Sequence, residues 1–314
     1  MEYVVAGTQG DPVINKIFIL GAGAIGSSCG VRLHKKNDVT LIGEKKHVDS
    51  INEKGLSVQG EIKGVFRIKA DTQIREIPPN SLVVLTTKVY DSEKAIEGIV
   101  KLLRKDTTIL ILQNGIGNEE IVKSVVGERC HVQRGVIHFG AEFLKPGEVN
   151  IMKGWIVLGN TEKGTEIAKL FNESGLETRV VADLRKDIWK KLIINCVINP
   201  LTAILQIKDY EIVVPSLERV RRGVVEECLE VARAEGVQLE RGLMEATDRE
   251  ISGLENYSSM HQDLMKGRRT EIDFLNGKIV EFGRKYGIPT PINESLVSMI
   301  KFLEEKNARG VQGK

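Results

Sequence analysis

Short apolar runs separated by amphipathic segments characterise the first part of the chain. Five of these runs have the length and composition of strands buried on both faces, which show continuous hydrophobic sequence. They are residues 16–20, 39–42, 81–87, 108–112 and 178–181. The segments between them predict helices that end near residue 36 or span residues 47–54, 92–104 and 165–174. Two further stretches alternate like strands and carry turn signals, a hairpin-like excursion at 56–70 and a β-rich region at 130–159.

The pattern changes after Ala182, where apolar positions begin to recur at helical spacing. This spacing predicts helices at 184–205, 216–235, 240–255, 258–282 and 293–306. We therefore expect two domains, with strands and helices in residues 1–183 and helices alone in residues 184–314. The first 14 residues are interpreted as a short mobile extension, and residues 308–314 as a frayed tail.

A glycine-rich turn directly follows the first predicted strand. The sequence G-A-G-A-I-G occupies residues 21–26 and opens a helical segment, which is the strand, turn and helix order of a dinucleotide-binding unit. In such a unit Gly21 permits the tight turn, Gly23 allows a pyrophosphate to approach, and Gly26 lets helix and strand pack closely. The N–H groups at the helix N-terminus then bind the phosphates. A purely structural glycine turn is the alternative.

The turn and the strand pattern together predict an α/β fold, with an N-terminal Rossmann-type dinucleotide-binding domain followed by an all-α C-terminal domain. Cofactor contacts are expected from the whole turn, Gly21, Ala22, Gly23, Ala24, Ile25 and Gly26. Ligands of open parallel sheets bind beyond the carboxyl ends of the strands, where Lys88 and Asn114 follow two of the predicted strands. A solvated loop lysine and a turn residue before glycine are the alternatives for these two positions.

A thin polar stripe interrupts the otherwise apolar helix predicted at 184–205. Lys191, Asn195 and Asn199 stand four residues apart and so share one face of that helix. Burying an ammonium group and two carboxamides without partners costs several kcal/mol, and a substrate could be the partner. The alternative is a buried stripe satisfied by neighbouring backbone groups. Pro200 removes one helical hydrogen bond and should kink the helix or end it just past the polar positions.

A second group of polar residues lies at 256–277. Ser259 followed by Gln262 fits a capping box, which gives Ser259 the structural role of a helix N-cap. Glu271 and Asp273 fit surface carboxylates paired with the neighbouring arginines, and such pairs contribute little to stability.

Composition and charge restrict the classes of function. The formal net charge of +2 over 314 residues argues against a nucleic-acid binder. The four cysteines stand far apart without a C-x-x-C pair, which favours reduced thiols in the cytoplasm. The five histidines form no cluster with metal-ligand spacing, so no metal site is expected. No run of about 18 apolar residues exists, so we expect a cytoplasmic protein that does not span a membrane.

These motifs resemble those of the ketopantoate reductase (2-dehydropantoate 2-reductase) family, over roughly residues 16–306. The resemblance rests on G-A-G-A-I-G, T-K at 87–88, Q-N-G at 113–115, W-K-K-L-I-I-N-C-V-I-N-P-L-T-A at 189–203, and S-S-M-H-Q-D with R-R-T-E-I-D-F-L-N-G between 258 and 277. It implies reduction of 2-dehydropantoate to pantoate, on the route to pantothenate and coenzyme A, with NADP(H) as the cofactor.

The resemblance also implies roles for individual residues. Lys191 is the expected proton donor to the ketone oxygen, and Asn195 and Asn199 are expected to hold the substrate. Further substrate contacts are expected from Asn114, Asn256, Ser258 and Ser259, and further cofactor contacts from Lys88, Asn114, Ala141 and Glu271. The helical domain would close over the carboxyl edge of the sheet, and a homodimer is possible because many members pair through that domain.

The residue types agree with this chemistry. A hydride that reaches a ketone carbon leaves negative charge on the oxygen, and a proton or a cation must neutralise that charge. A partly desolvated lysine suits the role, because burial and neighbouring charges tune its pKa.

Two positions depart from the family pattern. Asp209 stands where members usually carry an asparagine, and a carboxylate there would repel an anionic keto acid, which argues against a substrate contact. Glu44 stands close to where NADPH-using members place an arginine, at a spacing that suits binding of a ribose 2′-hydroxyl. We therefore expect NAD(H) to be used at least as well as NADP(H), unless Lys45 or Lys46 binds the 2′-phosphate.

Two other functions stay open. A non-catalytic dinucleotide-binding sensor would keep the glycine turn but would have little use for the lysine–asparagine stripe. A reductase of the same build could act on another branched keto or hydroxy acid, because the apolar residues that set substrate size cannot be placed from the sequence.

Overall fold

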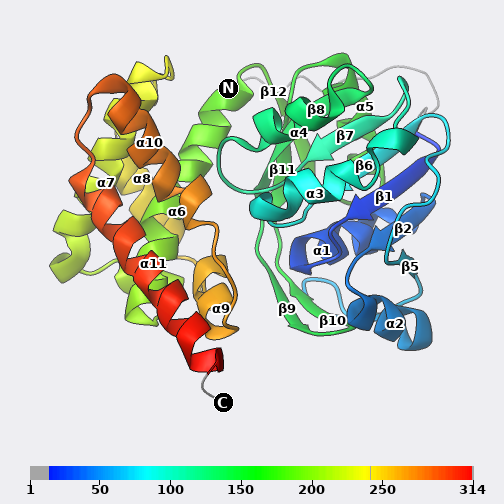
Figure 1. Ribbon diagram of the computed structural model, residues 1–314, viewed down its shortest axis with the longest axis horizontal. Coiled ribbons are helices and arrows are strands. Elements are labelled where there is room, and N and C mark those ends of the chain that lie inside the picture. Colours follow the sequence, from blue (N-terminus) through cyan, green and yellow to red (C-terminus); the bar gives the residue numbers. More distant parts are fainter. Residues whose placement is uncertain (1–13, 241, 313–314) are drawn as a thin grey trace. The chain divides into compact units, whose positions relative to one another are not determined.

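The computed structural model describes residues 14–240 and 242–312 (Figure 1). The chain forms two compact units. Of the described residues, the first unit contains those up to Gln113 together with Gly117–Leu184, and the second contains Asn114–Ile116 together with those from Arg185 onward. The predicted domain boundary lies after residue 183, and the sequence does not predict that 114–116 joins the second unit. Apart from Ile14, the expected mobile extension lies outside the described residues.

An eight-stranded sheet forms the centre of the first unit. In spatial order its strands are β12 (Thr178–Val181), β11 (Trp155–Gly159), β8 (His131–His138), β7 (Thr108–Ile111), β6 (Ser81–Leu85), β1 (Lys16–Leu20), β2 (Val39–Ile42) and β5 (Lys69–Asp71). Neighbouring strands run parallel except β8 and β11, which are antiparallel. The parallel strands therefore end at one edge, where the glycine turn also lies.

Helices and a smaller sheet accompany the central sheet of the first unit. The helices are α1 (Ala24–Leu33), α2 (Lys45–Lys54), α3 (Ser92–Glu97), α4 (Asn118–Val126) and α5 (Glu162–Glu173), with 3-10 turns η1 (Val89–Asp91) and η2 (Val100–Leu102). The smaller sheet has the order β4 (Gly64–Phe66), β3 (Leu56–Gly60), β10 (Glu148–Ile151) and β9 (Ala141–Lys145). Helix α1 contacts both β9 and β10, so the smaller sheet supports the helix that begins at the glycine turn.

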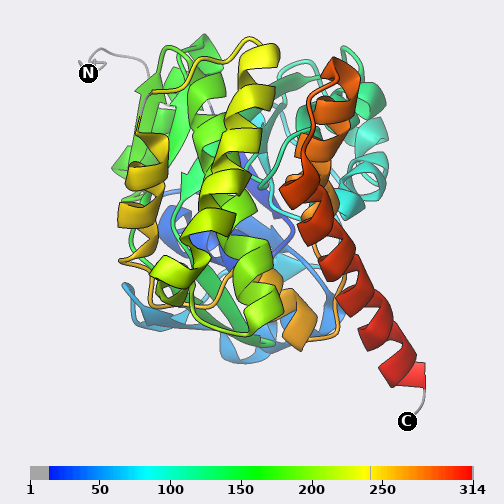
Figure 2. The same ribbon diagram turned by 90° about the vertical axis from the view of Figure 1, so that its left-hand side faces the viewer.

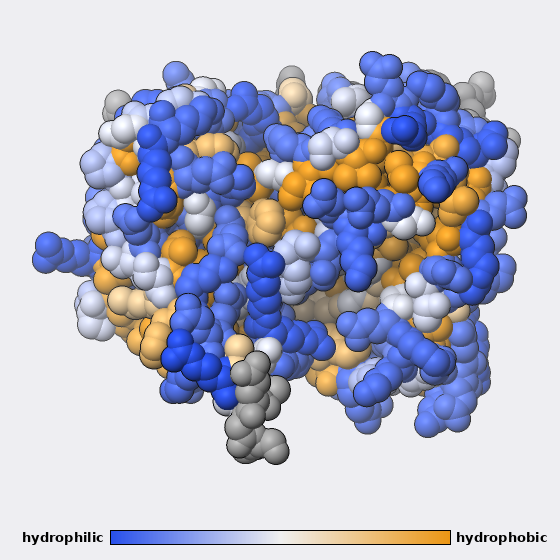
Figure 3. Space-filling view, viewed as in Figure 1, coloured by the Kyte–Doolittle hydropathy of each residue, from blue (hydrophilic) through white to orange (hydrophobic). Residues whose placement is uncertain are grey.

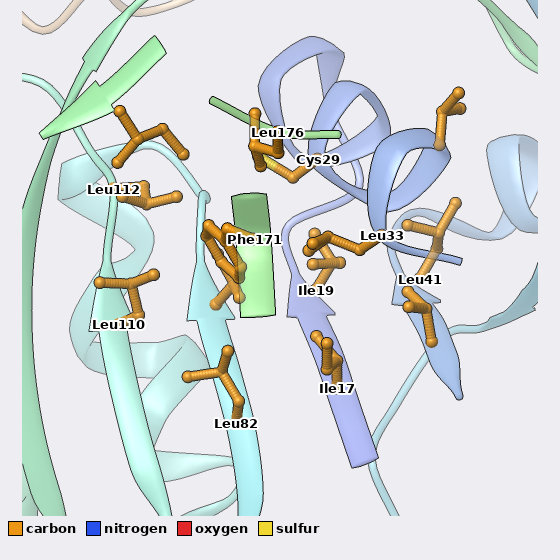
Figure 4. Packing of buried hydrophobic residues seen from close by; sticks show 14 of the residues in the cluster. Ile17, Ile19, Cys29, Leu33, Leu41, Leu82, Leu110, Leu112, Phe171 and Leu176 are labelled. Carbon is orange, nitrogen blue, oxygen red and sulfur yellow. The ribbon is translucent and has the colours of Figure 1, made fainter. Parts of the chain in front are cut away.

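Side chains of the central strands alternate between two buried faces, which explains why these strands are apolar at nearly every position. On one face Ile17 and Ile19 of β1 belong to the same buried cluster as Phe171 of α5 (Figure 4). On the other face Phe18 and Leu20 of β1 pack in a second cluster. Burying one such side chain stabilises the fold by about 1.5–3 kcal/mol, so both faces hold the strand ends in place.

The strands predicted for this unit from apolar runs are confirmed within two residues. The helix predicted at 92–104 is wrong in length, because α3 stops at Glu97 and a separate 3-10 turn follows Gly98. The alternating stretch 56–70 forms the β3–β4 hairpin, after which β5 pairs with β2 in the central sheet. Helix α4 occupies a stretch for which the sequence predicts no element.

In the described part of the chain, helices build the second unit. They are α6 (Leu184–Leu205), α7 (Pro215–Ala234), α8 (Leu243–Ile251), α9 (Ser259–Met265), α10 (Asn276–Tyr286) and α11 (Pro291–Gln312), with 3-10 turns η3 (Asp209–Ile212) and η4 (Ile272–Phe274). Helix α11 lies beside α10, and both contact α7 (Figure 2). Residues 192–203 of α6 are all buried, so this helix forms the centre of the unit's core.

Helix α6 is the one described helix that is long and apolar enough to cross a membrane. Its most apolar window of 18 residues has a mean hydropathy of 1.4, and 72% of that window is buried inside the protein. The sequence contains no uninterrupted apolar run of that length, because Lys190 and Lys191 fall within the helix. Hydrophilic residues cover most of the visible face of this unit (Figure 3). The burial of α6 is that of a core helix.

Three predicted helices have other bounds. The single helix predicted at 258–282 is wrong, because α9 ends at Met265 and Gly267 has a left-handed φ of +63° before the chain reaches η4. The helix predicted at 240–255 is shorter in the structure, covering 243–251. The last helix begins earlier, at Pro291, and continues into the predicted frayed tail as far as Gln312.

Pro200 lies inside α6 without ending it. A residue at this position would normally donate its backbone N–H to the carbonyl of Cys196, four residues earlier, and proline has no N–H to give. The side chain of Asn276, from α10, supplies the missing donor, with its Nδ2 2.9 Å from the Cys196 carbonyl oxygen. Of the two outcomes expected at Pro200, a kink or an end, the helix does not end there, and its predicted span of 184–205 is confirmed. A distant residue satisfies the carbonyl that proline leaves free.

Candidate active site

The glycine turn has two packed positions and one open position. An added Cβ at Gly21, whose φ is +110°, would lie 2.4 Å from the Thr87 backbone nitrogen, and one at Gly26 would lie 2.2 Å from the Gly21 carbonyl oxygen. A Cβ at Gly23 would meet nothing within 4 Å. Gly23 is also the N-cap of α1 and no described side chain caps that helix, so its first N–H groups suit an anion. This cradle fits the pyrophosphate of a dinucleotide.

Hydrogen bonds from the Gln113 side chain connect the ends of β6 and β7. Its Nε2 donates hydrogen bonds to the Thr87 carbonyl oxygen at 2.8 Å and to the Ser92 hydroxyl at 2.7 Å. This holds the start of η1, where Lys88 is half-buried at the N-cap position. Gln113 is the first residue of the Q-N-G motif, and the sequence predicts no role for it. The sequence feature that could have indicated a role for Gln113 is its position as a polar residue directly after an apolar strand.

Glu44 lies where the chain passes from β2 to α2. It is exposed at the N-cap of α2 and makes no capping hydrogen bond. Lys45 is exposed and pairs with Asp49 at 2.8 Å, one turn along the same helix. Lys46 is also exposed. The structure therefore presents the carboxylate and both lysines at this strand end.

His47 joins α1 to the smaller sheet beneath this strand end. Its Nδ1 accepts a hydrogen bond from the Gly147 backbone N–H at 2.9 Å, and its Nε2 lies 3.3 Å from the Ser27 hydroxyl. Burial lowers the pKa of His47, against the smaller effect of the Glu44 charge, so the neutral ring is favoured. Ala141 is half-buried at the start of β9 in the same sheet.

In the second unit, α6 carries the predicted polar stripe. Lys191 is half-buried, and Asn195 and Asn199 are buried. Burial lowers the pKa of Lys191, while the charges of Glu250 and Asp209 oppose that shift. The Asn195 Nδ2 is buried and has no hydrogen-bond partner among the described residues. Neighbouring backbone groups thus do not satisfy the whole stripe, and an unpaired buried donor of this kind favours a ligand.

Asp209, at the start of η3, lies in the same polar region. It is 3% exposed. Its Oδ2 accepts a hydrogen bond from the Asn256 Nδ2 at 2.7 Å, and its backbone N–H donates to the Asn256 carbonyl oxygen at 3.0 Å. Burial raises the pKa of Asp209 to about 7, against the opposing effects of the Asn256 hydrogen bond, the Lys191 charge and the Ser258 backbone.

Ser258, not Ser259, is the N-cap of α9. The Ser258 hydroxyl accepts a hydrogen bond from the His261 backbone N–H at 3.1 Å, and it also accepts one from the Thr202 hydroxyl of α6 at 2.8 Å. Ser259 is the first residue of the helix and is exposed. The N-cap therefore lies one residue before the predicted one, and the predicted capping box is wrong, because Gln262 donates its Nε2 to the Tyr257 carbonyl oxygen at 2.9 Å. The Ser258 cap is also bonded to α6.

The short segment 114–116, which contains the predicted ligand contact Asn114, belongs to the second unit. The Ile116 backbone N–H donates to the Phe274 carbonyl oxygen at 3.2 Å. Gly115 has φ +83°, and a Cβ there would lie 2.4 Å from the same oxygen. The segment of Asn114 thus lies against η4, which begins immediately after Glu271.

Glu271 and Asp273 have different surroundings. Glu271 is 8% exposed, so its interpretation as a surface carboxylate is wrong. Asp273 is partly exposed and pairs with Arg269 at 3.1 Å and Lys301 at 2.6 Å. The predicted arginine pairing is confirmed for Asp273.

A dinucleotide cradle in a Rossmann-type unit, followed by a helical unit with a partly unpaired lysine–asparagine stripe, defines a two-domain oxidoreductase. A family model described as "Ketopantoate reductase PanE/ApbA" matches residues 17–163, and its "C terminal" counterpart matches residues 183–304. A curated relative, the 2-dehydropantoate 2-reductase of Pyrococcus horikoshii, is 38% identical over 298 residues, covering 92% of this chain and 97% of the relative. The chain belongs to the ketopantoate reductase family.

Two solved structures are similar to the whole chain. A PanE/ApbA family ketopantoate reductase from Ralstonia eutropha has a TM-score of 0.85 at 33% identity, covering 93% of this chain and 99% of that one. A D-mandelate dehydrogenase in complex with NADH and anilino(oxo)acetate also has a TM-score of 0.85, at 31% identity and with the same coverage. The predicted fold class, a Rossmann-type domain followed by a helical domain, is confirmed.

Proposed function

We propose that this protein reduces the 2-keto group of 2-dehydropantoate to pantoate with a reduced nicotinamide cofactor, with Lys191 as the proton donor. The observation that carries the proposal is the stripe on α6. It combines a half-buried ammonium group whose pKa burial lowers with a buried amide donor, on Asn195, that has no partner in the described protein. The family and the name of the Pyrococcus horikoshii relative support the same reaction.

A bound reduced nicotinamide would supply the hydride. Lys191 holds a proton at Nζ for the ketone oxygen, on which negative charge develops. A lowered pKa makes that proton easier to release near neutral pH. Asn195 and Asn199 orient the keto acid from the same helix face, because they lie one and two turns beyond the lysine.

The other predicted site residues are assigned to the substrate or to the cofactor. We assign substrate contacts also to Asn114, Asn256 and Ser258, and cofactor contacts to the glycine turn, Lys88, Ala141 and Glu271. Ser259 is a weaker candidate for the substrate than Ser258, because it is exposed and Ser258 is buried against α6.

A substrate panel tests the reaction. The purified protein is mixed with NADPH or NADH and a series of 2-keto acids, and nicotinamide absorbance is followed. We expect 2-dehydropantoate to give the highest kcat/KM. Cofactor binding without oxidation by any 2-keto acid would favour the sensor alternative and refute the proposed function.

A second candidate substrate class comes from the D-mandelate dehydrogenase likeness, which matches the fold as closely as the ketopantoate reductase does. The panel therefore includes phenylglyoxylate, the keto acid that corresponds to mandelate. A higher kcat/KM for phenylglyoxylate than for 2-dehydropantoate would assign the chain to aromatic keto acids instead.

For the cofactor, we propose that NADH is used at least as well as NADPH. Glu44 is exposed at the end of β2, and Lys45 is paired with Asp49. We expect Glu44→Ala to lower kcat/KM for NADH relative to NADPH, because the acceptor for a ribose 2′-hydroxyl is lost. Glu53→Ala, an exposed carboxylate later in α2, is the matched control. A large NADPH preference that survives unchanged in Glu44→Ala would rule out the proposal.

A further inference from the structure

Asp209 has one carboxyl oxygen satisfied and one not. Its Oδ2 is committed as an acceptor to the Asn256 Nδ2 at 2.7 Å. Its Oδ1 is buried and has no hydrogen-bond partner among the described residues. An ionised carboxylate offers acceptor sites on both oxygens and is costly to bury when they are not used. A neutral acid needs only one further partner, an acceptor for its proton.

The reciprocal bonds with Asn256 decide which oxygen carries that proton. Because the Asn256 Nδ2 donates to Oδ2, Oδ2 is the carbonyl-type oxygen of the neutral acid and Oδ1 is the hydroxyl. On α6 and η3, two buried donors then lack a protein acceptor, the Nδ2 of Asn195 and the Oδ1 hydroxyl of Asp209; the Thr247 hydroxyl of α8 is a further unpaired group in the described part of this unit. Two unpaired donors and the Lys191 ammonium group suit an anionic ligand rich in oxygen.

The charges around Asp209 agree with a neutral carboxyl group. Burial raises its pKa to about 7, and the Asn256 hydrogen bond, the charge of Lys191 and the Ser258 backbone N–H oppose this shift only in part. In the described part of the chain no salt bridge joins the two side chains. Other charged or titratable groups lie on the elements that bond to η3 or carry a charge that acts there. They are Lys208, Tyr210 and Glu211 beside Asp209, Glu255 and Tyr257 in the segment whose carbonyls accept from η3, Arg221 on α7, Asp248 and Glu250 on α8, and His261 on α9.

Most of these groups are held by other partners. Arg221 and Asp248 pair with each other at 2.9 Å. His261 places its Nδ1 3.1 Å from the Thr202 carbonyl oxygen and stacks on Tyr257. Glu250 is exposed and acts on Lys191. Of the cations on these elements and on α6, Lys191 is the one whose charge lowers the pKa of Asp209.

We propose that Asp209 contacts the keto acid as a neutral carboxylic acid, donating a hydrogen bond from Oδ1 to the carboxylate of the substrate. The inference rests on the proposed function, since it needs an anionic 2-keto acid in this site. It reverses the sequence-based expectation, because a neutral acid attracts the anion that a carboxylate would repel. Substrate binding above neutral pH then takes up one proton from solvent, which becomes the proton on Oδ1.

The test compares the pH dependence of KM and kcat in the wild-type protein, Asp209→Asn and Glu211→Gln. Glu211 is the matched control, because it is an exposed carboxylate in the same 3-10 turn. We expect the wild-type KM for 2-dehydropantoate to rise about tenfold per pH unit above pH 7, as the binding-competent fraction falls. KM of Asp209→Asn should stay flat, because an amide donates at every pH. Glu211→Gln should follow the wild type.

Calorimetry gives a readout that does not depend on turnover. 2-Dehydropantoate is titrated into the protein with oxidised NADP at pH 8, in buffers of different ionisation enthalpy. We expect uptake of about one proton per substrate in the wild type and none in Asp209→Asn. Should Asp209→Asn fail to fold, the same titration of Lys191→Ala decides, because that variant lacks the other group of the site whose pKa is shifted toward neutral; loss of the uptake there would overturn the proposal.

Two results would overturn the proposal while leaving the proposed function intact. One is a wild-type KM that falls as the pH rises, which would show an ionised Asp209 accepting from a substrate hydroxyl. The other is an identical KM profile in Asp209→Asn. Absence of both binding and turnover with every 2-keto acid would instead refute the proposed function, so the two failures are distinguishable.

Discussion

Replacing Asp209 by asparagine should stabilise the helical unit increasingly as the pH rises from acid to neutral. The folded protein raises the pKa of this carboxyl group from 3.8 to about 7 by burial. Between those values the unfolded chain has released the proton and the folded chain keeps it, so the free energy of unfolding falls with pH. The loss is complete above pH 7 and absent below the unfolded pKa. An asparagine has no proton to lose.

The magnitude follows from the size of the shift. A rise from 3.8 to about 7 spans roughly 3 pKa units, and each is worth about 1.4 kcal/mol, so the wild type loses on the order of 4 kcal/mol. Asp209 is 3% exposed, so solvent screens little of this. The difference in unfolding free energy between Asp209→Asn and wild type should grow by that amount between pH 4 and pH 8.

Urea unfolding followed by tryptophan fluorescence measures this difference. The two units need not unfold together, and the chain offers one probe for each, Trp155 in β11 and Trp189 in α6. A Trp155→Phe background isolates the helical unit. Glu211→Gln, exposed in the same turn, should show no such growth. Parallel pH profiles for Asp209→Asn and wild type would refute the reasoning, because Asp209 would then titrate at its ordinary pKa.

Three other changes probe the site and its scaffold. We expect Lys191→Ala to lower kcat by about 10²–10⁴-fold while cofactor affinity stays nearly intact. Turnover and NADPH titration measure the two quantities. Near-normal turnover would show that the role of Lys191 is structural. Gly26→Ala should lower Tm, because its Cβ meets backbone at 2.2 Å, whereas Gly23→Ala should fold normally and bind NADPH less tightly. Equal cofactor affinity in Gly23→Ala would contradict the cradle. Asn276→Ala should cost about 1–3 kcal/mol of stability by leaving one α6 carbonyl unpaired. Adding Pro200→Ala should recover part of that stability by restoring a backbone N–H donor. If urea titrations show no recovery, Asn276 does not replace the donor that Pro200 lacks.

Features that depend on local sequence could be predicted from it. The glycine turn follows from six consecutive residues and a preceding apolar run, and the structure places it at the end of β1. The lysine–asparagine stripe follows from helical spacing within α6. In both cases the residues that matter are neighbours in the chain, so periodicity alone locates them.

Features that depend on distant contacts could not be predicted. Asn114 belongs to the second unit, where the neighbouring Ile116 bonds through its backbone to Phe274, 158 residues later in the chain. The ionisation of Asp209 depends on burial and on Asn256, which no local pattern reports. The sequence gives Asp209 only its formal charge, and burial favours the neutral form.

The bond from Asn276 to the Cys196 carbonyl also constrains when the stripe can take shape. The two residues are 80 positions apart, so a nascent chain that ends before Asn276 holds the entire α6 sequence while one carbonyl at its middle has no donor. That half of the helix becomes fully bonded only when α10 docks. The helical unit, which carries the lysine–asparagine stripe, is thus completed late in synthesis, after Asn276 has been added to the chain.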